Sequence, residues 1–496
     1  MATQTSLVGV GIRVRHVLAA LVAALLTAGI APAWAGNLFD ENLIANGDAE
    51  QGPAAAAGQR VAATGWNYSA GATVQEYNAF FPAPAQRPGA GDFGKRCFHG
   101  GLAGDSALFQ NVDLWAGAID VDADKVGFEL AGCFGGLGGR DDYARLTARF
   151  LDAGGKALAG TSIGGVTAAD RGSVTGLREA ATAGRVPPGT RAVALTLRLN
   201  RQGSEGANHA AADNLRLVLR RLDAPPPHTL RVLTLDLQGA ATVLHAANAI
   251  QLADADLVAL QEPGESLAAI AAQLGCYHHV LRPPAGPAIL SRFPIARTST
   301  DSVEVQPFPG PGVCLFNVVL PPLPTIGALV KRASTAADRE AAAVARAAHN
   351  ADVQALLAQA EPHVKAGQSV FLAGEFNEPS HLDWTASTSA MGRHGGRIVA
   401  WPTSQALLAG GLKDVFRALH ADELDHPGLT FPLAPAAGQD EGDRLDFIYY
   451  TGPALRPASV QLLGPDSKAP HLSYAPFPSG RRGLVAAFTV SPPVKK

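Results

Sequence analysis

Polar side chains with catalytic potential stand at the ends of apolar runs in the second half of the chain. The runs are DLVALQE (256–262), SVFLAGEFN (369–377) and DRLDFIYY (443–450). Several carboxylates at strand ends indicate a bound cation or an arginine network, for which Arg444 is a candidate partner. Oxygen ligands without neighbouring cysteine or histidine favour magnesium, manganese or calcium, and such ions suit phosphodiester chemistry. The residues concerned are Glu262, Glu375, Asn377, Asp443 and Asp446.

The elements that carry these side chains predict an α/β domain. The run 230–239 predicts a strand that enters a loop, and residues 240–252 have apolar side chains at helical spacing. An alanine-rich helix is predicted over 334–359 and another strand over 483–490. Strands that are apolar throughout are typical of sheets buried on both faces, and polar residues at their ends are typical of a site.

The same runs carry a resemblance to a known family. Over about 230–490 the chain resembles the endonuclease/exonuclease/phosphatase superfamily, which has the α/β four-layer sandwich of deoxyribonuclease I. The resemblance implies a phosphodiester or another phosphate-bearing ligand, and a Mg²⁺ or Mn²⁺ ion. It is carried, in order, by RVLTLDL (231–237), DLVALQE (256–262), AILSRFPI (288–295), LFNVVL (315–320), FLAGEFNEPSHLDW (371–384), DRLDFIYY (443–450) and PSGRRGLVAAF (478–488).

The resemblance also implies roles for single residues. Glu262 matches the metal-binding glutamate, and Asp236 stands beside it where the family has asparagine. Asn377 matches the asparagine that steadies the phosphate, and Asp446 matches the aspartate of the R-[IL]-D-F strand. Glu375 stands where the family has the aspartate that orients the attacking water.

Three departures from the family pattern remove chemistry. Glu375 is one methylene longer than aspartate, about 1.5 Å, and misplacements near 1 Å cost on the order of a hundredfold in rate. Val319 replaces a histidine and carries no titratable proton. Gly480 and Arg481 replace an aspartate–histidine pair, and arginine cannot act as a general base near neutral pH.

We therefore expect a pseudoenzyme or a phosphate-ligand-binding protein, in which Arg481 would bind an oxyanion through its guanidinium. One alternative is an active divalent-metal-dependent phosphodiesterase or phosphatase with a rearranged site, in which His381 or His471 stands in for a missing histidine. Another is a glycan-binding protein that acts through its N-terminal half.

The N-terminal half predicts an antiparallel β-sandwich of the jelly-roll type, because short β-type runs alternate with glycine clusters. It resembles galactose-binding-like domains and carbohydrate-binding modules. The resemblance implies a structural calcium shared by Glu50 and Asp213, although both could simply cap turns. Trp66 could stack on a sugar or belong to the core. The motifs are NLIANGDAEQG (42–52), GW (65–66), FQNVDL (109–114), DAGGKAL (152–158) and DNLRLVL (213–219).

Four segments are expected along the 496 residues. Residues 1–35 have a positive lead, a short apolar run and a small-x-small cleavage signal, which predicts a cleaved signal peptide and a secreted or periplasmic protein. The β-sandwich follows over 36–222, a proline-rich spacer over 223–228 and the phosphoesterase-like domain over 229–496. The apolar run of about 14 residues is shorter than the roughly 20 needed to span a bilayer, and no second apolar run of that length follows.

Charge and cysteine content narrow the expectations further. Forty basic and 43 acidic residues give a net charge of −3, which gives no strong nucleic-acid signal. The four cysteines lack the spacing of a zinc or redox motif. They predict either one disulfide in each half, Cys97 with Cys133 and Cys276 with Cys314, or buried thiols.

Overall fold

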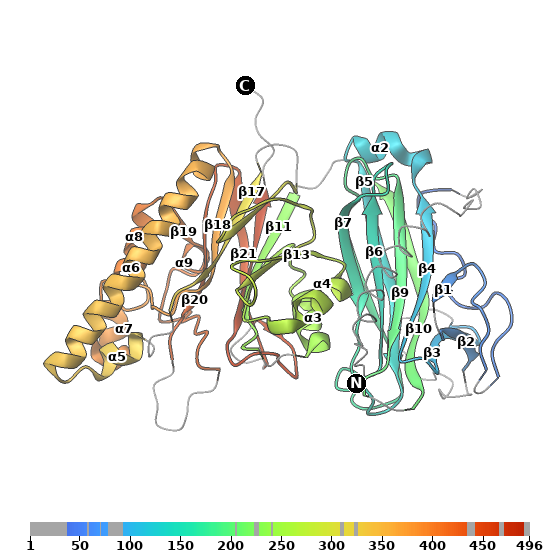
Figure 1. Ribbon diagram of the computed structural model, residues 1–496, viewed down its shortest axis with the longest axis horizontal. Coiled ribbons are helices and arrows are strands. Elements are labelled where there is room, and N and C mark those ends of the chain that lie inside the picture. The colour runs from blue at the N-terminus through green and yellow to red at the C-terminus, as the bar shows by residue number, and fades with distance from the viewer. Residues whose placement is uncertain are drawn as a thin grey trace, which may run out of the picture.

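The computed structural model contains two β-rich halves that lie side by side (Figure 1). Strands β1 to β10 form two sheets in the first half, and strands β11 to β23 form two sheets in the second. The predicted signal peptide and residues 223–227 of the predicted spacer lie outside the described residues, and His228 begins β11. The described residues are 37–56, 59–69, 71–77, 93–203, 206–222, 228–239, 242–307, 312–321, 326–433, 442–465 and 471–490.

The first half is a sandwich of two antiparallel five-stranded sheets. Leu195, Leu197 and Leu199 of β9 point into the core between the sheets, whereas Arg198 points to solvent. One sheet has the order β1 (Asn67–Ser69), β4 (Asp105–Asp113), β9 (Ala192–Asn200), β6 (Tyr143–Leu151) and β7 (Ala157–Gly164). The other has the order β2 (Thr73–Glu76), β3 (Arg96–Gly101), β10 (Asn208–Arg221), β5 (Val126–Gly136) and β8 (Gly176–Arg185).

The second half contains two mixed sheets that pack face to face. Phe371 of one sheet meets Phe488 of the other with ring centroids 5.0 Å apart, within a shared apolar core. The seven-stranded sheet has the order β13 (Tyr277–Val280), β14 (Ala288–Ser291), β12 (Leu257–Gln261), β11 (His228–Asp236), β23 (Gly483–Val490), β21 (Leu455–Gly464) and β22 (Leu472–Ser473). The six-stranded sheet has the order β15 (Ile295–Thr298), β16 (Ser302–Val305), β17 (Val313–Val319), β18 (Ser369–Glu375), β20 (Asp446–Thr451) and β19 (Lys413–Asp414).

Helices cover the outer faces of both sheets and complete four layers (Figure 1). Helices α3 (Val243–Leu252) and α4 (Leu267–Leu274) pack on the seven-stranded sheet, and α6 (Ala336–Lys365) and α8 (Pro402–Ala409) pack on the six-stranded sheet. This is the four-layer α/β sandwich that the strand motifs predict. Among the described residues, no helix combines the length and apolar character needed to cross a membrane. Shorter helices are α5 (Ile326–Arg332), α7 (Ala386–Ala390), η3 (Arg393–Gly396) and α9 (Val415–Leu419).

The strand register brings the expected site residues to one end of the sheets. In the six-stranded sheet Glu375 pairs with Val319 on one side and with Asp446 on the other. In the seven-stranded sheet Asp236 pairs with Gln261. Gly374 is required here, because its φ is +152° and a Cβ would lie 1.9 Å from the carbonyl oxygen of Val318. Polar groups from four strands can therefore meet at this end.

The expected disulfides are not formed. All four cysteines lie within the described residues, and none is bonded to another. Cys97 on β3 and Cys133 on β5 flank the two edges of β10, so their Cα atoms are separated by two strand spacings, about 10 Å, beyond the reach of a disulfide. Cys276 lies between α4 and β13, whereas Cys314 lies in β17, and each packs near a different outer helical layer.

Candidate active site

Arg481 lies in the middle of the polar residues that end the central strands. Its Nη2 forms an ion pair with Glu375 and donates to Asn377 Oδ1 at 3.1 Å. Its Nε lies 3.4 Å from Asp236 Oδ2, and its Nη1 lies 3.7 Å from Asp446 Oδ2. None of the five residues is more than 5% exposed. We call them the Arg481 cluster.

The backbone at Gly480 directs Arg481 into the cluster. Gly480 N–H donates to Gln238 Oε1 at 3.0 Å, and the Arg481 guanidinium lies 4.3 Å from the ring centroid of Phe431. A Cβ at position 480 would lie 2.5 Å from Gln238 Oε1. The aspartate that the family motif has at this position would therefore displace Gln238. Glycine at 480 leaves Gln238 in place to hold the backbone that precedes Arg481.

Burial dominates the ionisation of the three carboxyl groups. It raises the pKa of Glu375 to about 7 and the pKa of Asp446 to about 6, and it also raises the pKa of Asp236. The Arg481 guanidinium acts in the opposite direction on all three. One guanidinium does not compensate three buried carboxylates, so the cluster retains protons near neutral pH.

The arrangement does not fit the expected Mg²⁺ or Mn²⁺ ion. Glu262, the expected metal-binding glutamate, is exposed, and the residue has a left-handed φ of 45°. Asp236, the other expected ligand, faces the Arg481 guanidinium, whose charge would repel a divalent cation at this distance. In the described part of the chain, no group of three or more His, Cys, Asp and Glu side chains is placed to hold a metal ion.

The histidines considered as replacements have other neighbours. His381 Nδ1 shares a hydrogen bond of 2.7 Å with Ser404 Oγ. His471 is exposed, with its ring centroid 6.0 Å from that of His420, which in turn stacks on His426 at 4.5 Å. Neither His381 nor His471 joins the Arg481 cluster, so neither is placed as a general base beside Glu375.

A buried polar layer beneath the cluster was not predicted. Gln261 Nε2 donates to Asn317 Oδ1 at 2.7 Å, and Asn317 Nδ2 donates to the carbonyl oxygens of Leu260 and Ala288 at 3.0 and 2.8 Å. These bonds join β12, β14 and β17 across the two sheets. The only signal in the sequence is that both side chains fall within the family's strand motifs, at Gln261 of LQE and Asn317 of FNVV.

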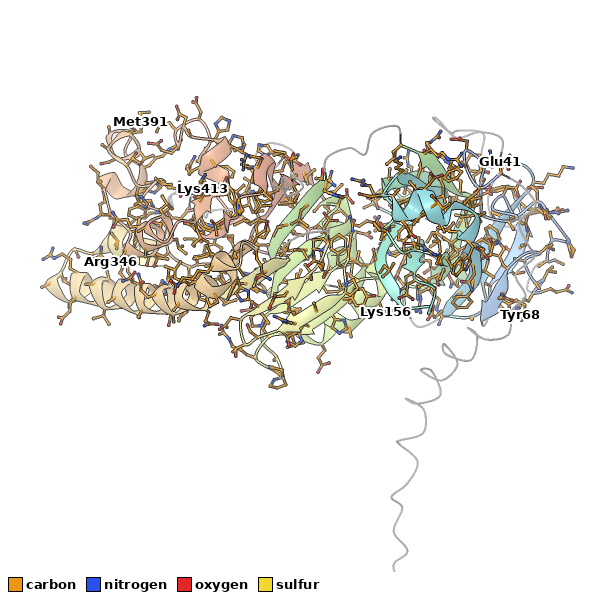
Figure 2. The ribbon with its side chains drawn as sticks, turned by 90° about the horizontal axis from the view of Figure 1, so that it is seen from above. Glu41, Tyr68, Lys156, Arg346, Met391 and Lys413 are labelled. Atoms are coloured by element: carbon orange, nitrogen blue, oxygen red, sulfur yellow. The ribbon has the colours of Figure 1, made fainter. Side chains whose placement is uncertain are left out.

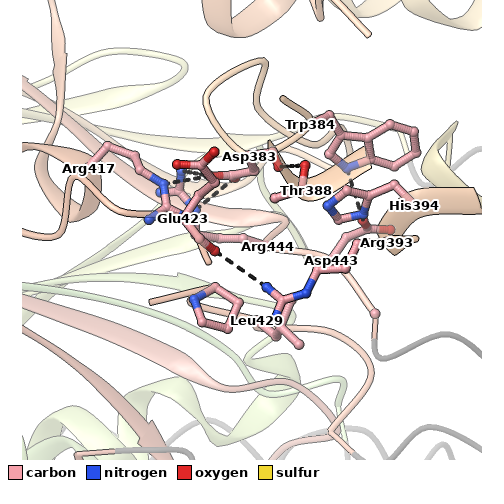
Figure 3. Close-up of a pocket in the computed structure, with 12 residues that line it drawn as sticks. Asp383, Trp384, Thr388, Arg393, His394, Arg417, Glu423, Leu429, Asp443 and Arg444 are labelled. Carbon is pink, nitrogen blue, oxygen red and sulfur yellow. Dashed lines mark hydrogen bonds and ion pairs between the residues drawn. The ribbon is translucent and has the colours of Figure 1, made fainter. Parts of the chain in front are cut away.

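A second charge network lies next to the cluster and lines a pocket (Figure 3). Arg444, the sequence-predicted partner of the strand-end carboxylates, instead forms ion pairs with Asp383 at 3.0 Å and Asp414 at 2.6 Å. Arg417 also pairs with Asp383, at 2.7 Å.

Asp443 belongs to the same region and is satisfied by different partners. Lys331 Nζ lies 2.9 Å from one of its oxygens, and Trp384 Nε1 donates to the other at 3.2 Å. His394 stacks on Trp384 with ring centroids 4.5 Å apart (Figure 3). The predicted rim carboxylate Asp443 therefore takes part in a structural network, and sequence analysis missed its partners because they come from segments far away in the chain.

The predicted site residues of the N-terminal half have partners within the protein. Glu50 Oε1 accepts the backbone N–H groups of Lys95 and Arg96 at 2.6 and 2.7 Å, and Asp213 accepts a hydrogen bond from Tyr77. Each carboxylate therefore has protein partners of its own. The shared calcium stays a prediction. Trp66 is 6% exposed and meets Phe98 edge to face at 5.5 Å, so it is a core residue and not a sugar platform.

The fold defines the class of this protein as a deoxyribonuclease I-like α/β sandwich, joined to an N-terminal β-sandwich, with an arginine among the carboxylates at its strand ends. The chain belongs to the Endonuclease/Exonuclease/phosphatase family, which matches residues 199–468. The match begins at the end of β9, so it also includes β10 of the first half.

Individual relatives share limited sequence with the chain. It is 30% identical over 129 residues to the uncharacterized protein F14F9.5 of Caenorhabditis elegans, a stretch that covers 24% of this chain and 40% of that protein. Truncated Caenorhabditis elegans TDP2 is 16% identical with a TM-score of 0.35, covering 53% of this chain and 98% of its own. An AP endonuclease from Archaeoglobus fulgidus is 18% identical with a TM-score of 0.35, covering 53% and 100%.

Proposed function

We propose that the second domain is a catalytically silent member of its family and that the protein acts by binding. The observation that carries this proposal is the ion pairing of Arg481 with Glu375, Asp236 and Asp446. Family-type hydrolysis needs a base that orients a water molecule and a group that contacts the phosphate. Glu375 is engaged with a guanidinium, and Val319 offers no polar group at the neighbouring strand end.

The same geometry argues against the expected role of Arg481 as an oxyanion-binding group. Each of its three nitrogens faces a carboxylate oxygen, and the side chain is 5% exposed. A phosphate would have to displace three negative charges to reach it. The family name implies a phosphoester, and we propose that any such ligand does not enter the Arg481 cluster.

An assay with a generic phosphodiester tests this proposal. We expect the full chain to hydrolyse bis(p-nitrophenyl) phosphate, with Mg²⁺ or Mn²⁺ present, no faster than its Glu262→Ala variant. Glu262 is exposed, so this substitution should preserve the fold. Turnover by the unmodified chain that the variant loses would refute the proposal and support the alternative of an active enzyme with a rearranged site.

A second candidate function is glycan binding by the N-terminal sandwich, supported by Trp115. Its indole is 58% exposed, and the Arg191 guanidinium lies 5.2 Å from the ring centroid. Arg191 also pairs with Asp122 at 2.7 Å, which places charged hydrogen-bonding groups beside an exposed aromatic face. We expect Trp115→Ala to abolish any binding to a glycan array, while Tyr68→Ala, at another exposed aromatic, leaves it intact. Equal loss in both variants would remove Trp115 as the platform.

We also propose that residues 1–35 direct export, so that the protein acts in the periplasm or outside the cell. The support is the pattern of the leader, with a positive start, an apolar run and Ala33-Trp34-Ala35 at its end. N-terminal sequencing of the protein recovered from its native host tests this, because cleavage should leave Gly36 as the first residue. An intact leader on the mature protein would contradict it.

A further inference from the structure

The two halves of the molecule meet at a buried arginine. Arg145 on β6 is 2% exposed and reaches across to α3 of the second half, where Nη2 donates to Asn248 Oδ1 at 2.5 Å and Nη1 bonds to Gln251. Both partners are neutral amides, and burial lowers the pKa of Arg145 to about 10. The sandwich presents this side to the second domain, as the position of Lys156 in the β6–β7 turn shows (Figure 2).

Each amide on α3 also returns a hydrogen bond to the sandwich. Asn248 Nδ2 donates to the carbonyl oxygen of Gly165 at 2.7 Å, and Gln251 Nε2 donates to that of Gly164 at 3.0 Å. A Cβ at Gly165 would lie 2.3 Å from Arg145 Nη2, so glycine lets the backbone approach the guanidinium. The contact is therefore a closed set of directional bonds that fixes α3 against the sandwich.

Asn248 extends this set to the segment that carries Arg481. Its Nδ2 lies 3.1 Å from the hydroxyl of Tyr474, and that hydroxyl lies 2.9 Å from His245 Nδ1. Burial raises the pKa of Tyr474 to about 12, so the hydroxyl stays protonated, accepts from Asn248 and shares a hydrogen bond with His245. Tyr474 is 8% exposed and lies seven residues before Arg481.

We infer that the N-terminal sandwich positions Arg481 in its cluster, acting through Arg145, Asn248 and Tyr474. These three are positioning residues, because none of them touches the cluster. The segment from Tyr474 to Arg482 is fixed near its other end by Gly480, which donates to Gln238, and by Arg482 N–H, which donates to the carbonyl oxygen of Thr430 at 2.9 Å. At its start, Tyr474 N–H donates to the carbonyl oxygen of Gly464 at 2.9 Å, and the Tyr474 hydroxyl bonds to Asn248 of α3, which the sandwich holds through Arg145. The inference rests on the position of Arg481 and not on the absence of hydrolysis.

Other contacts between the halves provide a matched control. Tyr277 Oη donates to the carbonyl oxygen of Ala157 at 2.6 Å, between β13 and β7. This bond joins the same two halves through β13 and β7, away from α3 and the segment 474–482. Removing its hydroxyl therefore weakens the interface without touching the path from Arg145 to Arg481.

Hydrogen exchange of the full chain tests the inference. We expect Tyr474→Phe and Arg145→Met each to speed the exchange of the backbone amides of 477–482 by about tenfold, the effect of losing one or two buried hydrogen bonds. Carbodiimide labelling of Glu375 should increase in the same variants, because Arg481 leaves its carboxylate more often. Tyr277→Phe should change neither readout. If the two variants do not exceed Tyr277→Phe in both measurements, the sandwich does not position Arg481.

A double variant shows whether Arg145 and Tyr474 act along one path or whether each weakens the contact between the halves on its own. If Arg145 acts through Tyr474, the double variant Arg145→Met/Tyr474→Phe should exchange at 477–482 no faster than the faster single variant. If the two substitutions multiply each other's effect on the exchange rate, Arg145 does not act through Tyr474. Should Arg145→Met fail to fold, Asn248→Asp replaces it, because aspartate keeps an acceptor for Arg145 but cannot donate to Tyr474. Neither result depends on whether the protein hydrolyses a phosphodiester, so the proposed function can fail separately.

Discussion

Replacing Arg481 with methionine should destabilise the protein in a strongly pH-dependent way. The substitution keeps much of the side-chain volume and removes the charge that faces Glu375, Asp236 and Asp446. Removing one partner of a buried ion pair typically costs about 3–5 kcal/mol, because the remaining charge stays buried. We expect the free energy of unfolding to fall by this amount at pH 8. At that pH each of the three buried carboxyl groups either keeps an uncompensated charge or takes up a proton, and both cost free energy.

The loss of unfolding free energy caused by Arg481→Met should be smaller at acidic pH. The folded-state pKa values of Glu375 and Asp446, about 7 and about 6, lie above those of the unfolded chain. A raised folded pKa contributes stability that is fully present below the unfolded pKa and is lost as the pH rises through the folded pKa. At pH 5 both groups already hold protons in the wild type, so Arg481 compensates mainly Asp236. We expect the cost of Arg481→Met to fall to about 1–2 kcal/mol there.

Urea denaturation of wild type and Arg481→Met at pH 5, 6, 7 and 8 measures this difference, with the double variant Arg481→Met/Glu375→Gln as the control. The double variant removes the carboxylate with the highest of these pKa values along with the guanidinium, so its cost should vary less with pH. A cost of Arg481→Met that is equal at pH 5 and pH 8, or below about 1 kcal/mol at pH 8, would refute the reasoning that Arg481 compensates buried carboxylates.

Three further outcomes follow from the same structure. The free energy of unfolding of Glu375→Gln should lie within about 1 kcal/mol of the wild-type value at pH 6, because glutamine mimics the protonated acid. At pH 8.5 the variant should be more stable in urea than the wild type. A large loss of stability at pH 6 would show that the carboxylate is charged there. Gly374→Ala should cost more than about 3 kcal/mol, since its Cβ would meet the backbone of Val318, whereas Gly367→Ala, with a φ of +73° and open space around it, should cost about 1–2 kcal/mol. Dithiothreitol should leave the thermal midpoint unchanged, because the cysteines form no disulfide; a lower midpoint would contradict that arrangement.

Seven strands of the second half could be predicted because each carries its own short motif: β11, β12, β14, β17, β18, β20 and β23. Helix α6 could also be placed near its true start, since Thr335 and Asp338 form a capping box at Ala336. Its end could not be placed, because the helix continues through Pro362 to Lys365, past the predicted end at Gln359. Propensity disfavours proline inside a helix, and packing against the six-stranded sheet outweighs that preference here.

It was easier to predict which residues belong to the site than how they are arranged. Glu375, Asn377, Asp446 and Arg481 each stand at a motif position, and the strand register brings them together. Glu262 stands at a motif position too, yet its backbone is left-handed and its side chain is exposed, which no residue pattern reveals. The sequence left the cysteines as either disulfides or thiols for a similar reason, because the separation of two cysteines depends on strand order and not on spacing in the chain.

The partner of Arg481 was the least predictable feature, and it decides the interpretation. A guanidinium at a phosphate site predicts oxyanion binding only if its donors are free to meet the ligand. Here the carboxylates that the family uses around its reacting centre are the partners of the guanidinium, and Arg444 fills the same role between Asp383 and Asp414. Buried carboxylates require a cation or a proton. Arg481 supplies a cation and the raised pKa values of Glu375 and Asp446 favour bound protons, so a ligand that binds at this end must displace an internal partner.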